Sequence, residues 1–114
     1  VRARAGELGI GIDFRQSNRE GELVEWVHDA IDAGAGIVIN PAAYTFTSIA
    51  LLDALKMFEG PIIEVHISNI HKREPYYHHS YVSKVATGVI DGLGVDGYAL
   101  ALKAIANINS GVRR

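Results

Sequence analysis

The sequence contains no cysteine, which excludes disulfide bonds, thiolate metal ligands and a cysteine nucleophile. It also lacks an excess of charge, because 11 lysines and arginines stand against 13 aspartates and glutamates, for a net charge of -2. This balance gives no electrostatic support for nucleic-acid binding. No apolar run approaches the roughly 20 residues needed to cross a bilayer. We therefore expect neither nucleic acid nor a membrane as a partner, and histidines and carboxylates must carry any chemistry.

The length of 114 residues and the hydrophobic content of 48% predict one packed domain over residues 1–114. The chain starts with Val1-Arg2-Ala3-Arg4, which lacks the apolar stretch of a signal peptide. These features predict a soluble, cytoplasmic protein.

Apolar periodicity predicts strands that alternate with helices. The predicted strands are residues 9–14, 37–39, 62–66 and 86–90, and the predicted helices are residues 20–33, 48–58 and 95–106. The helix over 48–58 has Ser48 as its N-cap and an apolar stripe of Ile49, Leu52, Leu55 and Met57. The last three strands are apolar enough to be buried on both faces. This order predicts an α/β fold with a doubly wound parallel sheet.

Polar residues stand where the predicted strands end, which is where ligands bind in such sheets. Asn40 follows one strand, His66 closes the next, and Gly88 to Asp91 close a third. Glu64 and His66 lie two residues apart on one strand, so both side chains project to the same face. A carboxylate beside His66 would favour its protonated form and orient it as a general acid. For an isolated pair, an ordinary strand-end salt bridge is the commoner explanation.

Three further residues could contact a ligand. Ser68 and the amides after its strand could bind a substrate carboxylate, Asn40 could orient water or a carbonyl group, and Arg73 could pair with an anion. Each also has a simple structural explanation. Ser68 could belong to an ordinary turn, and Asn40 could simply start a turn before Pro41. Arg73 could be a solvated loop charge paired with Glu74. Taken alone, Asn40 is better explained by the turn, and for Arg73 spacing leaves both explanations open.

The polar stretch from Ser68 to Lys84 has little apolar periodicity and is typical of a functional loop. Its histidines suggest zinc, but adjacent histidines are poorly placed to bind one ion, so we expect no metal site. Gly92, Gly94 and Gly97 match a dinucleotide-binding fingerprint. They follow the last strand, however, so we interpret the match as accidental and the glycines as turn and helix-start residues.

Several segments, in the right order and spacing, closely resemble type II 3-dehydroquinate dehydratases. The resemblance runs from about Leu8 to Ala106, and its segments are residues 14–18, 20–23, 37–44, 64–69, 73–75 and 78–82. It implies a flavodoxin-like fold, trimers that assemble into a dodecamer, and no cofactor. It also implies trans elimination of water from 3-dehydroquinate to 3-dehydroshikimate through an enolate.

The resemblance also implies roles for single residues. His66 would be the general acid that protonates the leaving hydroxyl, and Glu64 would orient it. Asn40 would help to hold the water that stabilises the enolate. Ile67 and Ser68 would bind the substrate carboxylate.

Two further roles and two departures follow from the same likeness. Arg73 would lie near the catalytic base, and Asp53 would reach the site of a neighbouring subunit within the trimer. Tyr77 stands where the family usually has an arginine, and Phe46 where it usually has a histidine. Both family residues contact substrate hydroxyls, so their replacement leaves those hydroxyls with weaker partners, at a cost of about 1 to 3 kcal/mol each.

Family members usually begin with a strand and a mobile lid that carries an arginine and the tyrosine base. By likeness, residues 1–8 are the end of the first helix, and the family's first strand would lie between the strands at 9–14 and 37–39. Without it those two strands would expose unpaired backbone edges. We therefore expect further residues, or another chain, to complete the sheet.

Two alternatives to the dehydratase remain open from the sequence. One is a diverged lyase that acts on a less hydroxylated cyclic acid, which Phe46 and Tyr77 suggest. The other is a flavodoxin-like assembly module without catalysis.

Overall fold

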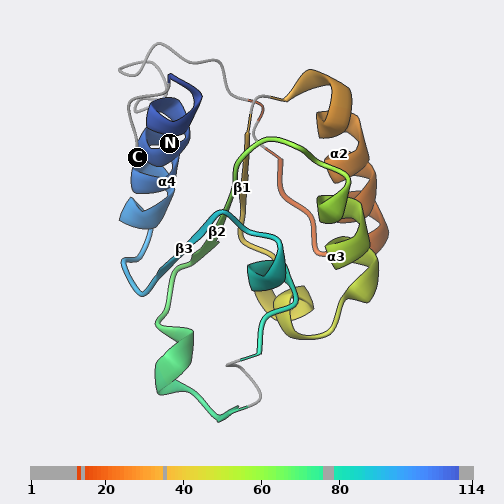
Figure 1. Ribbon diagram of the computed structural model, residues 1–114. Coiled ribbons are helices and arrows are strands. Elements are labelled where there is room, and N and C mark those ends of the chain that lie inside the picture. The colour runs from red at the N-terminus through yellow and green to blue at the C-terminus, as the bar shows by residue number, and fades with distance from the viewer. Residues whose placement is uncertain (1–12, 14, 35, 76–78, 111–114) are drawn as a thin grey trace.

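The computed structural model describes residues 13, 15–34, 36–75 and 79–110, without the side chains of residues 32 and 33 (Figure 1). Its helices and strands are α2 (Glu20–Ala33), β1 (Ile37–Ile39), α3 (Ile49–Lys56), β2 (Ile62–His66), β3 (Gly88–Asp91) and α4 (Asp96–Asn109). Short 3-10 turns η1 (Ala42–Phe46), η2 (Ile70–Lys72) and η4 (Val82–Lys84) lie in the connections.

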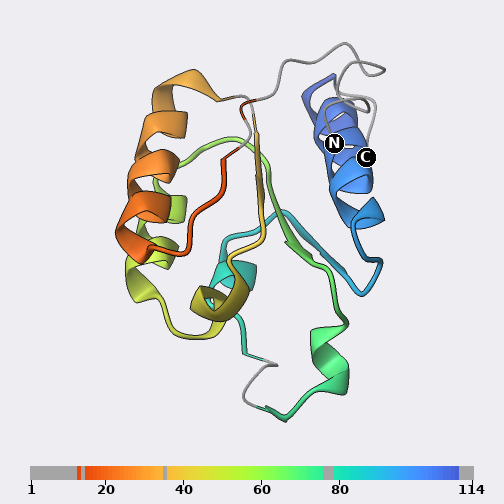
Figure 2. The same cartoon turned by 180° about the vertical axis from the view of Figure 1, so that it is seen from behind.

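The strands form a parallel sheet in the order β1-β2-β3. Helices α2 and α3 cover one face of this sheet, and α4 covers the other (Figures 1 and 2). The two apolar clusters of the core follow this division, since Leu51 and Leu55 of α3 pack on one side and Ala101 and Ile105 of α4 on the other. The doubly wound parallel sheet predicted from the sequence is therefore confirmed.

Helix α3 starts as predicted, but the residues on its buried side differ from the predicted apolar stripe. The Ser48 hydroxyl accepts a hydrogen bond from the Leu51 amide, so it caps the helix. Ile49 and Met57 are 57% and 58% exposed, because with 3.6 residues per turn both lie on the side of the helix away from Leu51 and Leu55. The buried helix positions are Leu51, Leu52, Ala54 and Leu55.

Strand β3 is shorter and less buried than predicted. It begins at Gly88 instead of Ala86, and Val89 is 44% exposed, because β3 pairs with β2 along one side and ends the three-stranded order. The strand predicted at 9–14 falls almost entirely outside the described residues. Among the described helices, none is long and apolar enough to cross a membrane.

Glycines shape the turn from β3 into α4. Gly92 and Gly94 have φ angles of 81° and 60°, which side-chain-bearing residues rarely adopt. Gly97 is buried in the first turn of α4, where a Cβ atom would lie 3.1 Å from Val65 Cγ1. The interpretation of these glycines as turn and helix-start residues is confirmed.

Candidate active site

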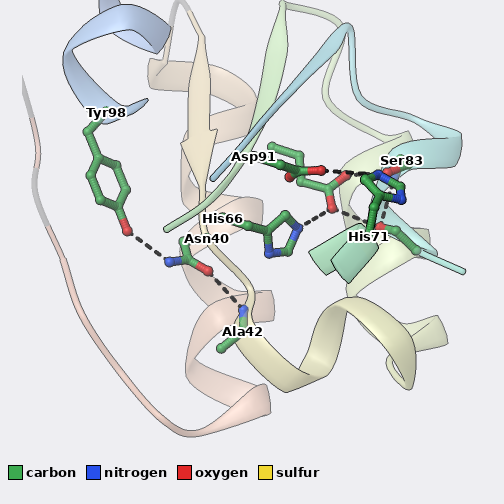
Figure 3. Close-up of polar contacts among 9 residues, drawn as sticks. Asn40, Ala42, His66, His71, Ser83, Asp91 and Tyr98 are labelled. Atoms are coloured by element: carbon green, nitrogen blue, oxygen red, sulfur yellow. Dashed lines mark hydrogen bonds and ion pairs between the residues drawn. The ribbon is translucent and has the colours of Figure 1, made fainter. Parts of the chain in front are cut away.

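Three polar side chains meet at the carboxyl edge of the sheet. Asn40 directly follows β1, His66 is the last residue of β2, and Asp91 is the last residue of β3. The parallel register pairs His66 with Asp91, so β2 and β3 end at the same level, and it pairs Ile39 with Glu64, so β1 ends two residues earlier. Figure 3 shows Asn40, His66 and Asp91 along this edge. The sheet therefore brings together residues that lie 25 or more positions apart in the chain.

Glu64 and His66 form a buried pair. Their side chains are 0% and 5% exposed, and His66 Nε2 lies 2.5 Å from Glu64 Oε2. The Ser83 hydroxyl donates to Glu64 Oε1 at 2.5 Å, and the Ser80 hydroxyl donates to Glu64 Oε2 at 2.9 Å. Three donors thus converge on one carboxylate.

This arrangement decides the ionisation of Glu64 and the roles of the imidazole nitrogens. Burial raises the pKa of Glu64, but hydrogen bonds from His66, Ser83 and Ser80 outweigh it, and the net pKa is lowered from 4.5. An ionised carboxylate only accepts hydrogen bonds, so His66 Nε2 carries the proton that it shares with Glu64. The other ring nitrogen, Nδ1, is separated from Nε2 by a ring carbon and therefore faces a different direction from the Glu64 contact. Proton transfer to a ligand would therefore pass through Nδ1.

Asn40 is held at both ends of its amide. The Ala42 amide donates to Asn40 Oδ1 at 3.2 Å, and Asn40 Nδ2 donates to the Tyr98 hydroxyl at 2.9 Å (Figure 3). Because a backbone N–H cannot bond an amide nitrogen, the Ala42 contact determines which end of the side chain faces Tyr98. Ala42 itself has a φ of 51°, which is uncommon for a residue other than glycine. The turn after β1 and the Tyr98 hydroxyl thus fix the orientation of the Asn40 amide.

Turns beyond the strands are fixed by further contacts. The amides of Gly92 and Gly94 donate to the carbonyls of His66 and Ile67, both at 3.1 Å. His71 Nε2 lies 3.3 Å from Asp91 Oδ2, which ties η2 to the end of β3 (Figure 3). The segment after β2 is therefore anchored on the neighbouring strand.

The comparisons with known proteins agree on one family. The family model for dehydroquinase class II matches residues 1–106. The chain belongs to the class II dehydroquinase family.

Relatives and solved structures support the same assignment. The chain is 60% identical over 109 residues to 3-dehydroquinate dehydratase 2 of Agrobacterium fabrum, which covers 96% of this chain and 74% of the relative. It is 56% identical over 109 residues to 3-dehydroquinate dehydratase of Cereibacter sphaeroides, with the same two shares. The crystal structure of type II dehydroquinase from Propionibacterium acnes superposes with a TM-score of 0.88 at 47% identity, covering 92% of this chain and 77% of that one. The flavodoxin-like fold implied by the resemblance is confirmed.

The described structure brings together some, but not all, of the residues that the resemblance to class II dehydroquinases places at the site. Glu64, His66 and Asn40 lie together at the carboxyl edge, as predicted. Ile67 and Ser68 follow directly and are exposed, Ile67 by 48%. Their substrate contacts stay a prediction.

The other expected residues lie farther out. Arg73 is exposed in the loop after η2, and Asp53 is exposed on α3. Tyr77 lies outside the described residues. The described residues contain no group of three side chains suited to hold a metal ion.

Phe46 lies against the acid expected for the family. Its ring and the His66 imidazole have centroids 6.3 Å apart and an interplanar angle of 24°. The position at which the resemblance leads us to expect a histidine therefore lies beside His66. An aromatic ring there packs on the imidazole and offers no hydrogen bond to a substrate hydroxyl.

Sequence reasoning missed the partners of the predicted residues. Ser80 lies in the family-like segment 78–82 without an assigned role, and the sequence assigns no role in the site to Ser83 or Tyr98. Ser83 lies 19 positions from Glu64, and Tyr98 lies 58 positions from Asn40. No local pattern in the sequence marks contacts over such separations.

Proposed function

We propose that this chain eliminates water from 3-dehydroquinate to give 3-dehydroshikimate, by trans elimination through an enolate. Membership of the class II dehydroquinase family supports this reaction, as do relatives named 3-dehydroquinate dehydratase at 56 to 60% identity. The observation that carries the proposal is the buried Glu64–His66 pair at the carboxyl edge of the sheet. A diverged lyase or a non-catalytic module is not favoured.

Each residue of the edge then has a chemical task. A base, which by the family likeness is the tyrosine of the lid, accepts a carbon-bound proton next to the ketone and so forms the enolate. The N–H of Asn40 helps to hold the water that stabilises this enolate. In the second step the carbon–oxygen bond to the leaving hydroxyl breaks, and His66 Nδ1 gives this oxygen a proton, so that water leaves. Glu64 stabilises the imidazolium before that transfer and keeps Nδ1 directed at the ligand. No metal or cofactor is required by these steps.

The substrate carboxylate is assigned to Ile67 and Ser68, with Arg73 close to the base. Exposed backbone after a strand end is suited to bind an anion, and the exposure of both residues supports this assignment. Tyr77 is proposed as a further substrate contact.

Replacement of His66 by alanine tests the assignment of the acid. Turnover, followed by the absorbance of the conjugated enone product, is expected to fall by roughly 100-fold to 10,000-fold, the usual contribution of a general acid. His28→Ala is the matched control, because His28 is exposed on α2. Unchanged turnover in the His66 variant would refute the assignment.

A homododecamer of four trimers, in the cytoplasm, is also proposed from the family likeness. The exposed position of Asp53 on α3 supports a contact with a neighbouring subunit. Sedimentation equilibrium measures the assembly, and we expect trimers or their multiples. A monomer with full activity would contradict the role of Asp53 across subunits.

A further inference from the structure

The carboxylate that orients His66 is itself held by two serines outside the sheet. Ser80 and Ser83, here called the serine pair, donate to Glu64 Oε2 and Oε1 respectively. Glu64 has no exposed surface, so these protein hydroxyls take the place that water would have on an exposed carboxylate. Two of the three hydrogen bonds to the carboxylate therefore come from the serine pair.

The serine pair is placed by its own backbone. The Ser83 amide donates to the Ser80 hydroxyl at 3.0 Å, so the hydroxyl that accepts this bond has its own proton free for Glu64. Val82, between the two serines, is fully buried in the cluster formed with α3. The Tyr81 amide donates to the carbonyl of Thr45 at 2.8 Å, which joins this segment to η1. The hydroxyls are thus held in position before any ligand arrives.

The geometry restricts how the carboxylate can turn. Ser83 engages Oε1, which leaves Oε2 to face both Ser80 and His66 Nε2. Loss of the Ser83 hydroxyl would leave Oε1 without a donor and allow the carboxylate to rotate away from the imidazole. The hydrogen bond from His66 would then no longer define a single ring orientation.

We infer that Ser83, supported by Ser80, is a positioning residue for catalysis, because it fixes the Glu64 carboxylate that directs His66 Nδ1 toward the ligand. This inference rests on the proposed function, since His66 acts as the acid there. A purely structural role is the alternative, in which the hydroxyls only satisfy a buried charge. The two roles differ in what they do to kcat.

The experiment compares Ser83→Thr, which keeps the hydroxyl, with Ser83→Val, which has the same shape without it. Steady-state kinetics with 3-dehydroquinate are measured on the intact protein. We expect Ser83→Val to lower kcat by roughly tenfold, as for the loss of one hydrogen bond to a charged group, and to leave KM within about twofold. Ser83→Thr should retain wild-type kcat within about twofold.

Ser17→Val is the matched control, because the Ser17 hydroxyl also donates to a glutamate, Glu22 Oε1, at 2.8 Å on the surface. It should leave kcat and KM unchanged. Equal kcat in the two Ser83 variants would overturn the inference, as would a rise in KM at constant kcat. Ser83→Ala replaces the valine variant if thermal unfolding shows that valine disrupts the fold.

A second measurement does not depend on turnover. Nitrogen-15 shifts of the His66 ring, recorded at a pH where the ring is neutral, report which nitrogen carries the single proton, and we expect the Nε2–H form in wild type and Ser83→Thr. A mixture of forms in Ser83→Val supports the inference, and an unchanged Nε2–H form overturns it. If the wild type does not turn over 3-dehydroquinate, the proposed function fails, while this spectrum still decides the role of Ser83.

Discussion

A fully buried carboxylate is normally costly, because its charge loses the solvation of water. Glu64 lowers this cost with three hydrogen bonds, and its net pKa is lowered although burial by itself raises it. Removing one partner from such a cluster leaves a buried polar group unsatisfied. Activity and stability are therefore coupled at this residue.

Replacement of Glu64 by glutamine keeps the shape and removes the charge. The amide nitrogen is a donor, so it would face another donor at one of the positions now bonded to Ser83, Ser80 or His66. We expect a loss of about 1 to 3 kcal/mol in the free energy of unfolding and at least a roughly tenfold loss in kcat. Urea denaturation and steady-state kinetics measure the two effects. Glu59→Gln, on an exposed residue, is the control, and an active, stable Glu64→Gln protein would contradict this account.

The hydroxyl of Tyr98 is the acceptor that Asn40 uses to hold its amide. Tyr98→Phe removes that single oxygen, and we expect kcat to fall by about two- to tenfold, the equivalent of 0.5 to 1.5 kcal/mol. Tyr44→Phe is the control, because its hydroxyl donates to the Asn18 carbonyl instead. Steady-state assays measure kcat for both variants. Equal kcat values would show that the Tyr98 hydroxyl does not position Asn40 for catalysis.

At the scale of elements, the turn from β3 into α4 determines how the end of β2 is anchored. The amides of Gly92 and Gly94 both donate to carbonyls just after Glu64 in the chain, at His66 and Ile67. Both glycines have positive φ angles, but their surroundings differ. A Cβ atom at Gly92 would lie 3.0 Å from Asn69 Cβ, while a Cβ atom at Gly94 would meet open space.

These two glycines provide a matched pair for alanine substitution. Gly94→Ala should cost about 1 to 2 kcal/mol of unfolding free energy, the strain of a left-handed residue with a side chain. Gly92→Ala should cost more, because the new methyl group also presses on Asn69. Urea denaturation of both variants gives the difference, and a smaller loss for Gly92→Ala would show that the Asn69 contact relaxes without cost.

At the scale of the whole molecule, the lowered pKa of Glu64 links folding to pH. The unfolded chain binds the proton near pH 4.5, and the folded chain binds it only at lower pH. The stability contributed by ionised Glu64 is therefore fully present above about pH 4.5 and is lost as pH falls through the folded pKa. Chemical denaturation between pH 3 and pH 7 measures this dependence. In the Glu64→Gln variant the free energy of unfolding should depend less on pH. An equally steep loss of stability at acid pH in that variant would show that other groups cause the effect.

The local sequence pattern predicted the bounds of most helices and strands, but not which of their residues are buried. Helix α2 and strands β1 and β2 have the predicted bounds, because their apolar residues repeat with helix or strand periodicity. The stripe on α3 was wrong at Ile49 and Met57, since both lie on the side of the helix away from the buried Leu51 and Leu55. Strand β3 was predicted as fully buried, although composition cannot tell an edge strand from a central one.

The sequence by itself determined the chemistry available to this protein. Without cysteine it had to use histidines and carboxylates, and the spacing of Glu64 and His66 on one strand placed both on the same face. Only the tertiary structure decided what surrounds them. Ser83 contacts Glu64 across 19 residues, and Tyr98 contacts Asn40 across 58 residues. These contacts depend on how the loops and helices pack at one edge of the sheet, which no local periodicity encodes.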